Sequence, residues 1–216
     1  MTKFLLDGPD DAEVSILLAH GAGAPMDSAS LNASAKVLAA AGLRVARFEF
    51  DYMASRRTSQ AKRPPPRAEK LISEYIAAID ALDATGQLVI GGKSLGGRVA
   101  SMTAEQLHPS GRIAGLLCLG YPLHPIGKPD QLRTAHLADM QTPTLIVQGT
   151  RDPFGTREEV ATYKLSNSIE ILWLEDGDHD LKPRKAVSGF TVADHMLAMA
   201  IRVSSWTKRL TRQGNR

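Results

Sequence analysis

The sequence contains little cysteine and no long apolar run, and both features exclude classes of protein. Cys118 is the only cysteine among 216 residues, so no internal disulfide can form, which agrees with a reducing compartment. We expect Cys118 to be a small core residue, because it lies in the short apolar run 116–119. No stretch of about 18 consecutive apolar residues occurs, so no membrane span is expected.

The sequence also lacks a secretory signal and a metal-binding pattern. Its first seven residues include a lysine and an aspartate, and such a segment is too short and too polar for a signal peptide. The sequence therefore predicts a cytoplasmic protein without a membrane association. Cysteine or histidine pairs at metal-ligand spacing are absent from the sequence, so we expect neither a metal nor a cofactor.

Positive charge exceeds negative charge only slightly, but it is unevenly distributed. The formal net charge is +3. One basic cluster consists of Arg56, Arg57, Lys62, Arg63 and Arg67, and a basic tail consists of Lys208, Arg209, Arg212 and Arg216. Neither cluster is interleaved with aromatic residues or accompanied by a zinc module or a helix-turn-helix pattern. We therefore expect no nucleic-acid binding, and we interpret the tail as a solvated surface.

The order of apolar and amphipathic segments predicts an α/β fold. Hydrophobic residues make up 43% of the chain, as in an ordinary globular protein. Six apolar runs, at 14–19, 44–50, 87–91, 113–120, 144–148 and 169–174, alternate with helical patterns at 27–41, 67–85, 95–107, 157–165 and 188–210. Residues 4–7 favour an added antiparallel edge strand. We predict one domain over residues 1–216, with a mostly parallel sheet of six or seven strands and helices on both faces.

Two segments rich in proline interrupt this alternation. Residues 51–66 end in three consecutive prolines, and residues 121–130 contain three more, so we predict both segments to be loops. Each follows the carboxyl end of a predicted strand, the edge at which open parallel sheets bind ligands. Residues 121–140 are too few for more than one small helix, so we expect no separate cap domain and a site open to solvent.

The motif with the clearest chemistry lies at residues 92–96, which read Gly-Lys-Ser-Leu-Gly and fit the pattern G-x-S-x-G. It follows an apolar strand and opens a helical stretch, the context in which such a serine is exposed as a nucleophile. Glycine at both ends leaves room for a sharp turn, and the helix N-terminus favours developing negative charge. The sequence predicts Ser94 as the nucleophile; the alternative is a glycine-rich turn in which the serine only caps the helix.

A serine hydroxyl is a poor nucleophile at neutral pH and needs a general base. His179 lies in a polar loop directly after the last predicted strand, at the edge where the nucleophile is expected. The other candidates fit less well, because His195 lies within a helix, His108 ends the helix that begins at the nucleophile, and His124 and His136 precede the last two strands. The sequence therefore predicts His179 as the base.

The base in turn needs a carboxylate that fixes its tautomer and stabilises its cation. Asp152 directly follows the predicted strand 144–148. It completes the chain order serine, aspartate, histidine, which is the order of α/β-hydrolases. Asp178 and Asp180 flank His179 and are second choices, because a neighbouring side chain cannot easily fold back onto Nδ1.

An oxyanion hole needs two backbone N–H groups directed at the developing charge. The residue after the nucleophile, Leu95, is expected to supply one. The second is expected from the small-residue loop 20–24 after the first long strand, and we select Ala22. His20 in the same loop is expected to brace it rather than to take part in chemistry.

Several segments resemble known hydrolases. His-Gly-Ala-Gly at 20–23, Gly-Lys-Ser-Leu-Gly-Gly at 92–97, Gly-Thr-Arg-Asp at 149–152 and Gly-Asp-His at 177–179 resemble the α/β-hydrolase superfamily, near the dienelactone-hydrolase-like group. Residues 47–53, 56–57, 63–65 and 120–125 are similar to the KANL/Tex-type α/β-hydrolase-like family, although Asp51 replaces its proline. The resemblance implies the fold and the triad positions but no substrate, and some relatives are subunits of larger assemblies.

These observations predict a serine hydrolase that acts through an acyl-enzyme on an ester, thioester or related small acyl compound. The basic loop leads to a further expectation, that Arg56 and Arg57 bind a substrate bearing carboxylate or phosphate, although nearby acids such as Glu49 could instead neutralise them. The competing hypothesis is an interaction module with a vestigial triad, in which the basic loop binds an acidic partner.

Overall fold

The computed structural model describes residues 2–58, 64–84 and 86–214. Lys62 and Arg63 of the basic cluster and Arg216 of the tail lie outside the described residues. The strands are β1 (Phe4–Asp7), β2 (Val14–Ala19), β3 (Arg44–Phe48), β4 (Gln87–Lys93), β5 (Gly115–Leu119), β6 (Thr144–Gly149) and β7 (Ile169–Leu174). The α-helices are α1 (Ala29–Ala40), α2 (Asp51–Arg56), α3 (Ile72–Ala81), α4 (Leu95–Leu107), α5 (Arg157–Val160), α6 (Lys185–Ser188) and α7 (Val192–Gly214), and short 3₁₀ turns are η1 (Ala68–Leu71) and η2 (Ala135–Leu137).

The seven strands form one sheet in the order β1-β3-β2-β4-β5-β6-β7. All neighbours are parallel except β1, which pairs antiparallel with β3. The predicted α/β fold and its antiparallel edge strand are thus confirmed. The strands read as continuous apolar runs because helices cover both faces, and every residue of β2 and β6 is buried.

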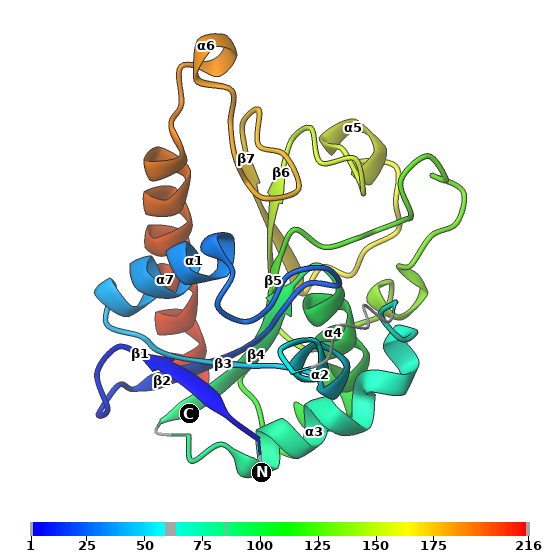
Figure 1. Ribbon diagram of the computed structural model, residues 1–216. Coiled ribbons are helices and arrows are strands. Elements are labelled where there is room, and N and C mark those ends of the chain that lie inside the picture. The colour runs from blue at the N-terminus through cyan, green and yellow to red at the C-terminus, as the bar shows by residue number, and fades with distance from the viewer. Residues whose placement is uncertain (1, 59–63, 85, 215–216) are drawn as a thin grey trace.

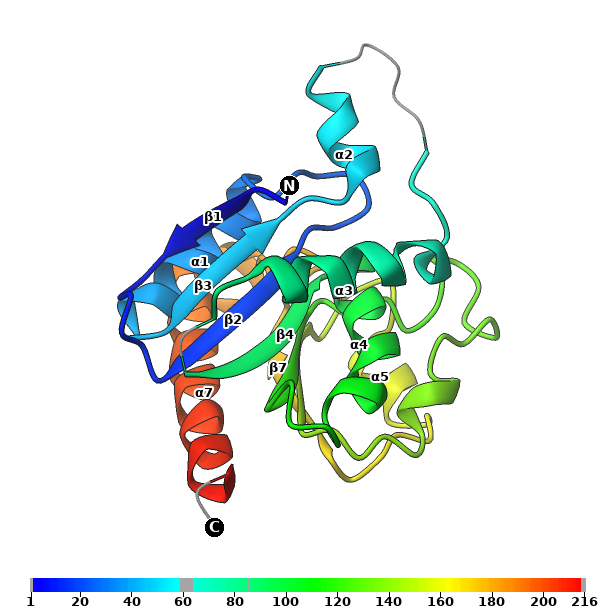
Figure 2. The ribbon, with the colours of Figure 1, turned by 90° about the horizontal axis from the view of Figure 1, so that it is seen from below.

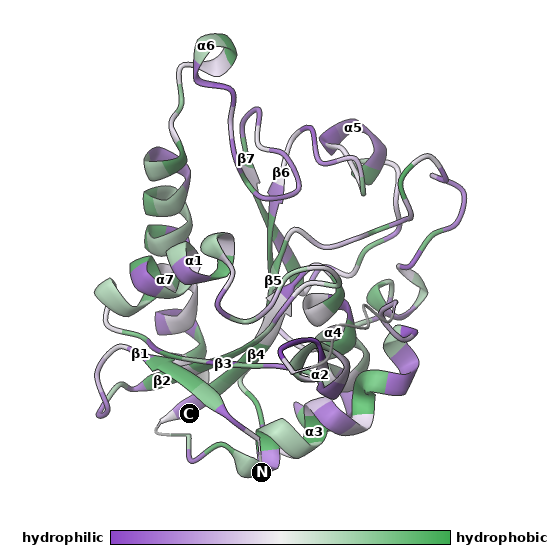
Figure 3. Cartoon of the chain, viewed as in Figure 1, coloured by the Kyte–Doolittle hydropathy of each residue, from purple (hydrophilic) through white to green (hydrophobic). Residues whose placement is uncertain are grey.

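The sheet separates the core into two layers, and helices cover each of them (Figures 1 and 2). Helices α1 and α7 lie on one face of the sheet, and α3 and α4 lie on the other. Figure 3 shows hydrophobic residues along the central strands and hydrophilic ones over α2. None of the helices that the structure describes combines the length and apolarity that crossing a membrane requires.

Several predicted bounds are wrong. The predicted helix 157–165 is the shorter α5, which ends at Val160, and the predicted helix 67–85 is η1 followed by α3, which ends at Ala81. Residues 51–66 are not all loop, because α2 occupies Asp51–Arg56. Asp51 lies in its first turn, where a carboxylate suits the positive end of the helix, and Met53 anchors it in the core. The predicted helix 188–210 is instead the short α6 and the longer α7, separated at Gly189, which ends α6 in the left-handed region at φ 79°.

The strand register brings several strand ends to one level. Ala19 at the end of β2 pairs with Gly92, and Lys93 at the end of β4 pairs with Leu119 near the end of β5. Gly149 at the end of β6 pairs with Leu174 at the end of β7. The loops that follow these strands therefore converge on the same edge of the sheet.

Candidate active site

Ser94 occupies a strained turn between β4 and α4. Its backbone has φ 50° and ψ −113°, a conformation that costs energy in a residue with a side chain and recurs at functional sites. The turn requires glycine on both sides, because a Cβ at Gly92 or Gly96 would lie 2.5 Å from the carbonyl oxygen of Ala19. The same turn aims Ser94 away from the sheet at the N-terminus of α4.

The structure brings Ser94, His179 and Asp152 together. His179 Nε2 lies 2.9 Å from Ser94 Oγ, and His179 Nδ1 lies 2.8 Å from Asp152 Oδ2. With Nδ1–H donating to the carboxylate, Nε2 is the free acceptor for the serine hydroxyl proton. This geometry places an imidazole within reach of the hydroxyl and a carboxylate behind the imidazole, which is the arrangement that activates a serine by general-base catalysis.

Asp152 is fully buried and accepts hydrogen bonds at both oxygens. Besides His179, Oδ2 accepts from Gln148 Nε2 at 3.0 Å, and Oδ1 accepts from the backbone N–H of Phe154 at 2.9 Å. The Phe154 ring also lies against His179, with ring centroids 4.3 Å apart. Sequence analysis missed both Gln148 and Phe154; the signal available was their position beside Asp152 at the end of β6.

Lys93, one of the two variable residues of the nucleophile motif, makes contacts that the sequence did not suggest. Its Nζ donates to the backbone oxygen of His179 at 2.5 Å and lies 3.6 Å from Asp180 Oδ1. Burial lowers the pKa of the Lys93 ammonium, while the nearby charges of Asp180 and Asp152 oppose that shift. Lys93 thus ties the histidine loop to the strand that carries Ser94.

The loop that carries Ala22 is fixed by two side chains. His20 donates from Nδ1 to the Gly21 oxygen at 2.6 Å and accepts the Phe50 N–H at Nε2, and burial lowers its pKa, so it braces the loop as a neutral ring. The Tyr52 hydroxyl donates to the Ala22 oxygen at 3.0 Å, and burial raises its pKa to about 12.

Two cavities border Ser94. One, of about 250 Å³, also contacts Ala22, Lys93 and His179. The other, of about 520 Å³, contacts Ala22, Leu95 and the proline segment 65–66. Leu95 opens α4, so its N–H belongs to the first helical turn, whose N–H groups lack partners within the helix.

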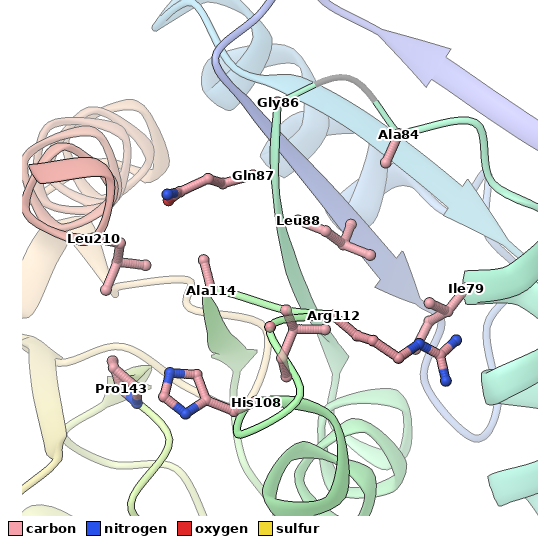
Figure 4. A pocket seen from close by; sticks show the side chains of 12 residues that line it. Ile79, Ala84, Gly86, Gln87, Leu88, His108, Arg112, Ala114, Pro143 and Leu210 are labelled. Atoms are coloured by element: carbon pink, nitrogen blue, oxygen red, sulfur yellow. The ribbon is translucent and has the colours of Figure 1, made fainter. Parts of the chain in front are cut away.

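Two larger cavities lie elsewhere. A cavity of about 750 Å³ lies at the opposite edge of the sheet (Figure 4), where Arg112 pairs with Asp80 and the polar wall also includes Gln87 and His108. The described residues of its lining include no serine, cysteine or carboxylate. An apolar groove of about 810 Å³ runs between α1 and α7. Neither cavity borders the Ser94 cluster.

A second serine–histidine hydrogen bond occurs within the described residues, between Ser101 Oγ and His136 Nε2 at 2.8 Å. Ser101 is 1% exposed and its Oγ also donates to the Arg98 oxygen, at 2.8 Å. Burial and the Arg98 charge lower the pKa of His136, and no described carboxylate pairs with its ring. This pair joins α4 to η2 and lacks the access that a nucleophile requires.

Arg56 and Arg57 lie on α2 and its C-terminus, and neither lines the two cavities at Ser94. The Arg57 guanidinium donates to Glu49 and to Asp27, and these bonds raise its pKa. Arg56 lies over the Tyr52 ring, 5.3 Å from its centroid. Their substrate-binding role stays a prediction, although Arg57 already has two carboxylate partners.

Residues 12–208 match the alpha/beta hydrolase domain family, so the chain belongs to that family and is a hydrolase. A candidate protein-lysine deacylase of Rattus norvegicus, ABHD14B, is 30% identical over 76% of this chain and 74% of its own length.

Two solved structures have a fold similar to that of this chain. Dienelactone hydrolase from Anabaena variabilis has a TM-score of 0.70 and 22% identity, covering 96% of this chain and 91% of that chain. A serine hydrolase without a lid from Xanthomonas campestris has a TM-score of 0.66 and 15% identity, and the match covers 96% of this chain and 88% of that chain. At these identities the likeness shows the fold alone.

Proposed function

We propose that this hydrolase is a serine hydrolase working through an acyl-enzyme. Ser94 is the nucleophile, His179 the general base and Asp152 the orienting acid. The observation that carries the proposal is the unbroken hydrogen-bond chain from Ser94 Oγ through His179 to the buried Asp152.

Each step of the proposed mechanism follows from this series of hydrogen bonds. His179 Nε2 takes the proton of Ser94 as Oγ attacks the acyl carbonyl carbon, and the backbone N–H groups of Ala22 and Leu95 stabilise the resulting oxyanion. His179 then gives the proton to the leaving group, which departs and leaves an ester on Ser94. Water, deprotonated by His179, attacks that ester, releases the acid and restores the serine.

The substrate class is an ester, a thioester or a related acyl compound. The likeness to ABHD14B adds acyl-lysine amides as a candidate within the same chemistry, because the same acyl-enzyme forms from an amide. No step requires a metal or a cofactor.

The test compares two serines. Hydrolysis of a short 4-nitrophenyl ester is measured for wild type, Ser94→Ala, His179→Ala and, as the matched control, Ser101→Ala. Members of one catalytic unit fail together, so the first two variants should lose activity to a similar low level, roughly 10⁴-fold or more below wild type. Ser101→Ala should remain active; loss of activity there with activity retained in Ser94→Ala would transfer the role to the Ser101–His136 pair.

A further inference from the structure

The two cavities at Ser94 divide the substrate between them, if the proposed acyl-enzyme mechanism holds. His179 gives its proton to the leaving group, so the leaving group lies on the histidine side, in the cavity of about 250 Å³ that His179 lines. The acyl group then extends to the other side, into the cavity of about 520 Å³ that Ser94 and Leu95 border. The chemistry of this acyl-side cavity therefore reports on the acyl group.

The acyl-side cavity is positively charged. Among the described residues of its lining, the charged ones are three arginines, Arg67, Arg98 and Arg133, and one carboxylate, Glu69. The other walls are proline, alanine, leucine, phenylalanine and the serine itself. A cavity built for a purely apolar acyl chain has no use for this excess of guanidinium groups.

Arg98 is held next to the nucleophile. It lies on α4 one turn after Ser94, and its backbone N–H donates to the Ser94 carbonyl oxygen at 3.0 Å. Its guanidinium pairs with Glu69 at 3.0 Å. The Nε atom, however, is buried, and within the described part of the chain it has no hydrogen-bond partner. The Arg98 side chain as a whole is 21% exposed, and the residue lines the acyl-side cavity, so part of its guanidinium is accessible to a ligand.

Arg133 is anchored beside Arg98. Its backbone N–H donates to the Leu123 oxygen at 2.7 Å, and its backbone oxygen accepts from the Tyr121 hydroxyl at 3.1 Å. The Arg133 side chain is half-buried, and no carboxylate of the described residues lies within ion-pair distance of it. Burial lowers the pKa of Arg133, and the positive charge of Arg98 lowers it further. Arg98 and Arg133 thus line one cavity together with Arg67, and Glu69 is the one carboxylate among the described residues of its lining.

We propose that Arg98 and Arg133 bind a carboxylate at the far end of the acyl group, so that the preferred substrates are half-esters, half-thioesters or half-amides of dicarboxylic acids. A planar guanidinium matches a carboxylate with two parallel hydrogen bonds. The anchored backbone of Arg133 reduces the ordering cost of that contact.

The experiment uses two esters with one leaving group: 4-nitrophenyl hydrogen adipate, whose acyl chain ends in a carboxylate, and its neutral methyl ester. Wild type should prefer the anionic ester in kcat/KM after subtraction of the uncatalysed rate. Arg133→Gln and Arg98→Gln should each lower the preference for the anionic ester, the ratio of its kcat/KM to that of the methyl ester, by roughly tenfold or more. Circular dichroism spectra and melting temperatures show whether each variant is folded.

Two control variants remove positive charges outside the acyl-side cavity. Arg112→Gln deletes one positive charge at the opposite edge of the sheet (Figure 4), and it should keep the preference. Arg56→Ala with Arg57→Ala tests the loop that the sequence suggested. Loss of preference in that double variant, with retention in Arg133→Gln, would overturn the assignment to Arg98 and Arg133.

A binding measurement separates this inference from the proposed function. Monomethyl adipate is titrated calorimetrically into Ser94→Ala and into Ser94→Ala with Arg133→Gln. Weaker binding in the second protein supports the carboxylate site, whether or not the esters are hydrolysed. Failure of wild type to hydrolyse either ester would refute only the proposed function. Equal binding in both proteins, or equal turnover of the two esters by wild type, would refute the carboxylate site alone.

Discussion

At the scale of single residues, Asp152 shows how the site is preorganised. The carboxylate is excluded from solvent, and its bonds from His179, Gln148 and the Phe154 backbone fill both oxygens. Asp178, the alternative carboxylate beside the histidine, faces another way, because its Oδ1 accepts the backbone N–H groups of Asp180 and Lys182. Asp152 thus holds the His179 ring, whereas Asp178 shapes the loop.

We therefore predict different outcomes for two conservative changes. Asp152→Asn should fold normally and lose ester hydrolysis by roughly 10⁴-fold, since an amide donor stabilises the wrong imidazole tautomer. Asp178→Asn should keep most of the rate, because an amide oxygen can still accept the two N–H groups. Steady-state rates beside circular dichroism spectra measure both; full activity in the first variant with loss in the second would exchange their roles.

At the scale of elements, the segment between β7 and α6 carries His179 and is fastened from two directions. Lys93 holds the carbonyl of His179. Asp176, a buried residue with φ 55°, accepts the Arg184 backbone N–H at 2.6 Å and pairs with its guanidinium. This pairing with Arg184 lowers the pKa of Asp176 to about 2.

This ion pair predicts a pH dependence of stability. A carboxyl whose pKa is depressed on folding stabilises the protein above its unfolded pKa of about 4, and that contribution disappears as the pH falls through about 2. Arg184→Gln should lower the melting temperature by a few degrees at pH 7, and the difference from wild type should shrink below pH 4. Lys185→Gln, which removes an adjacent charge, should change the melting temperature little. If Arg184→Gln lowers the melting temperature equally at pH 7 and at pH 3, the ion pair is not the cause.

The sequence predicts the strands better than the segments between them. A strand buried on both faces is mostly apolar, so β2 has the predicted bounds. The edge strand β7 also has its predicted bounds, although it is only half-buried up to Leu174. Helix α2 was missed because the prolines that follow it dominate the pattern, whereas its stability depends on the burial of Met53 and on a Glu74 side chain that accepts the Asp51 N–H. Such contacts join distant segments and leave no local pattern.

At the scale of the whole molecule, the site is an assembly of loops at one sheet edge. The meeting of Ser94, Asp152 and His179 at this edge could be predicted from the sequence, because each lies within five residues after a recognisable strand and their order along the chain matches the fold. Their hydrogen bonds, and the meeting of Arg98 on α4 with Arg133 from the β5–β6 connection, depend on how the loops pack. The two cavities at Ser94 could therefore be described only from the structure.

The central claim is that Ser94 is a covalent nucleophile activated by His179. The most direct measurement is labelling with a fluorophosphonate, followed by proteolysis and mass spectrometry of the modified peptide. The account predicts one adduct, on Ser94, that forms in wild type and in Ser101→Ala, is absent from Ser94→Ala and is strongly slowed in His179→Ala. An adduct on another residue, or no adduct on the folded wild-type protein, would contradict it.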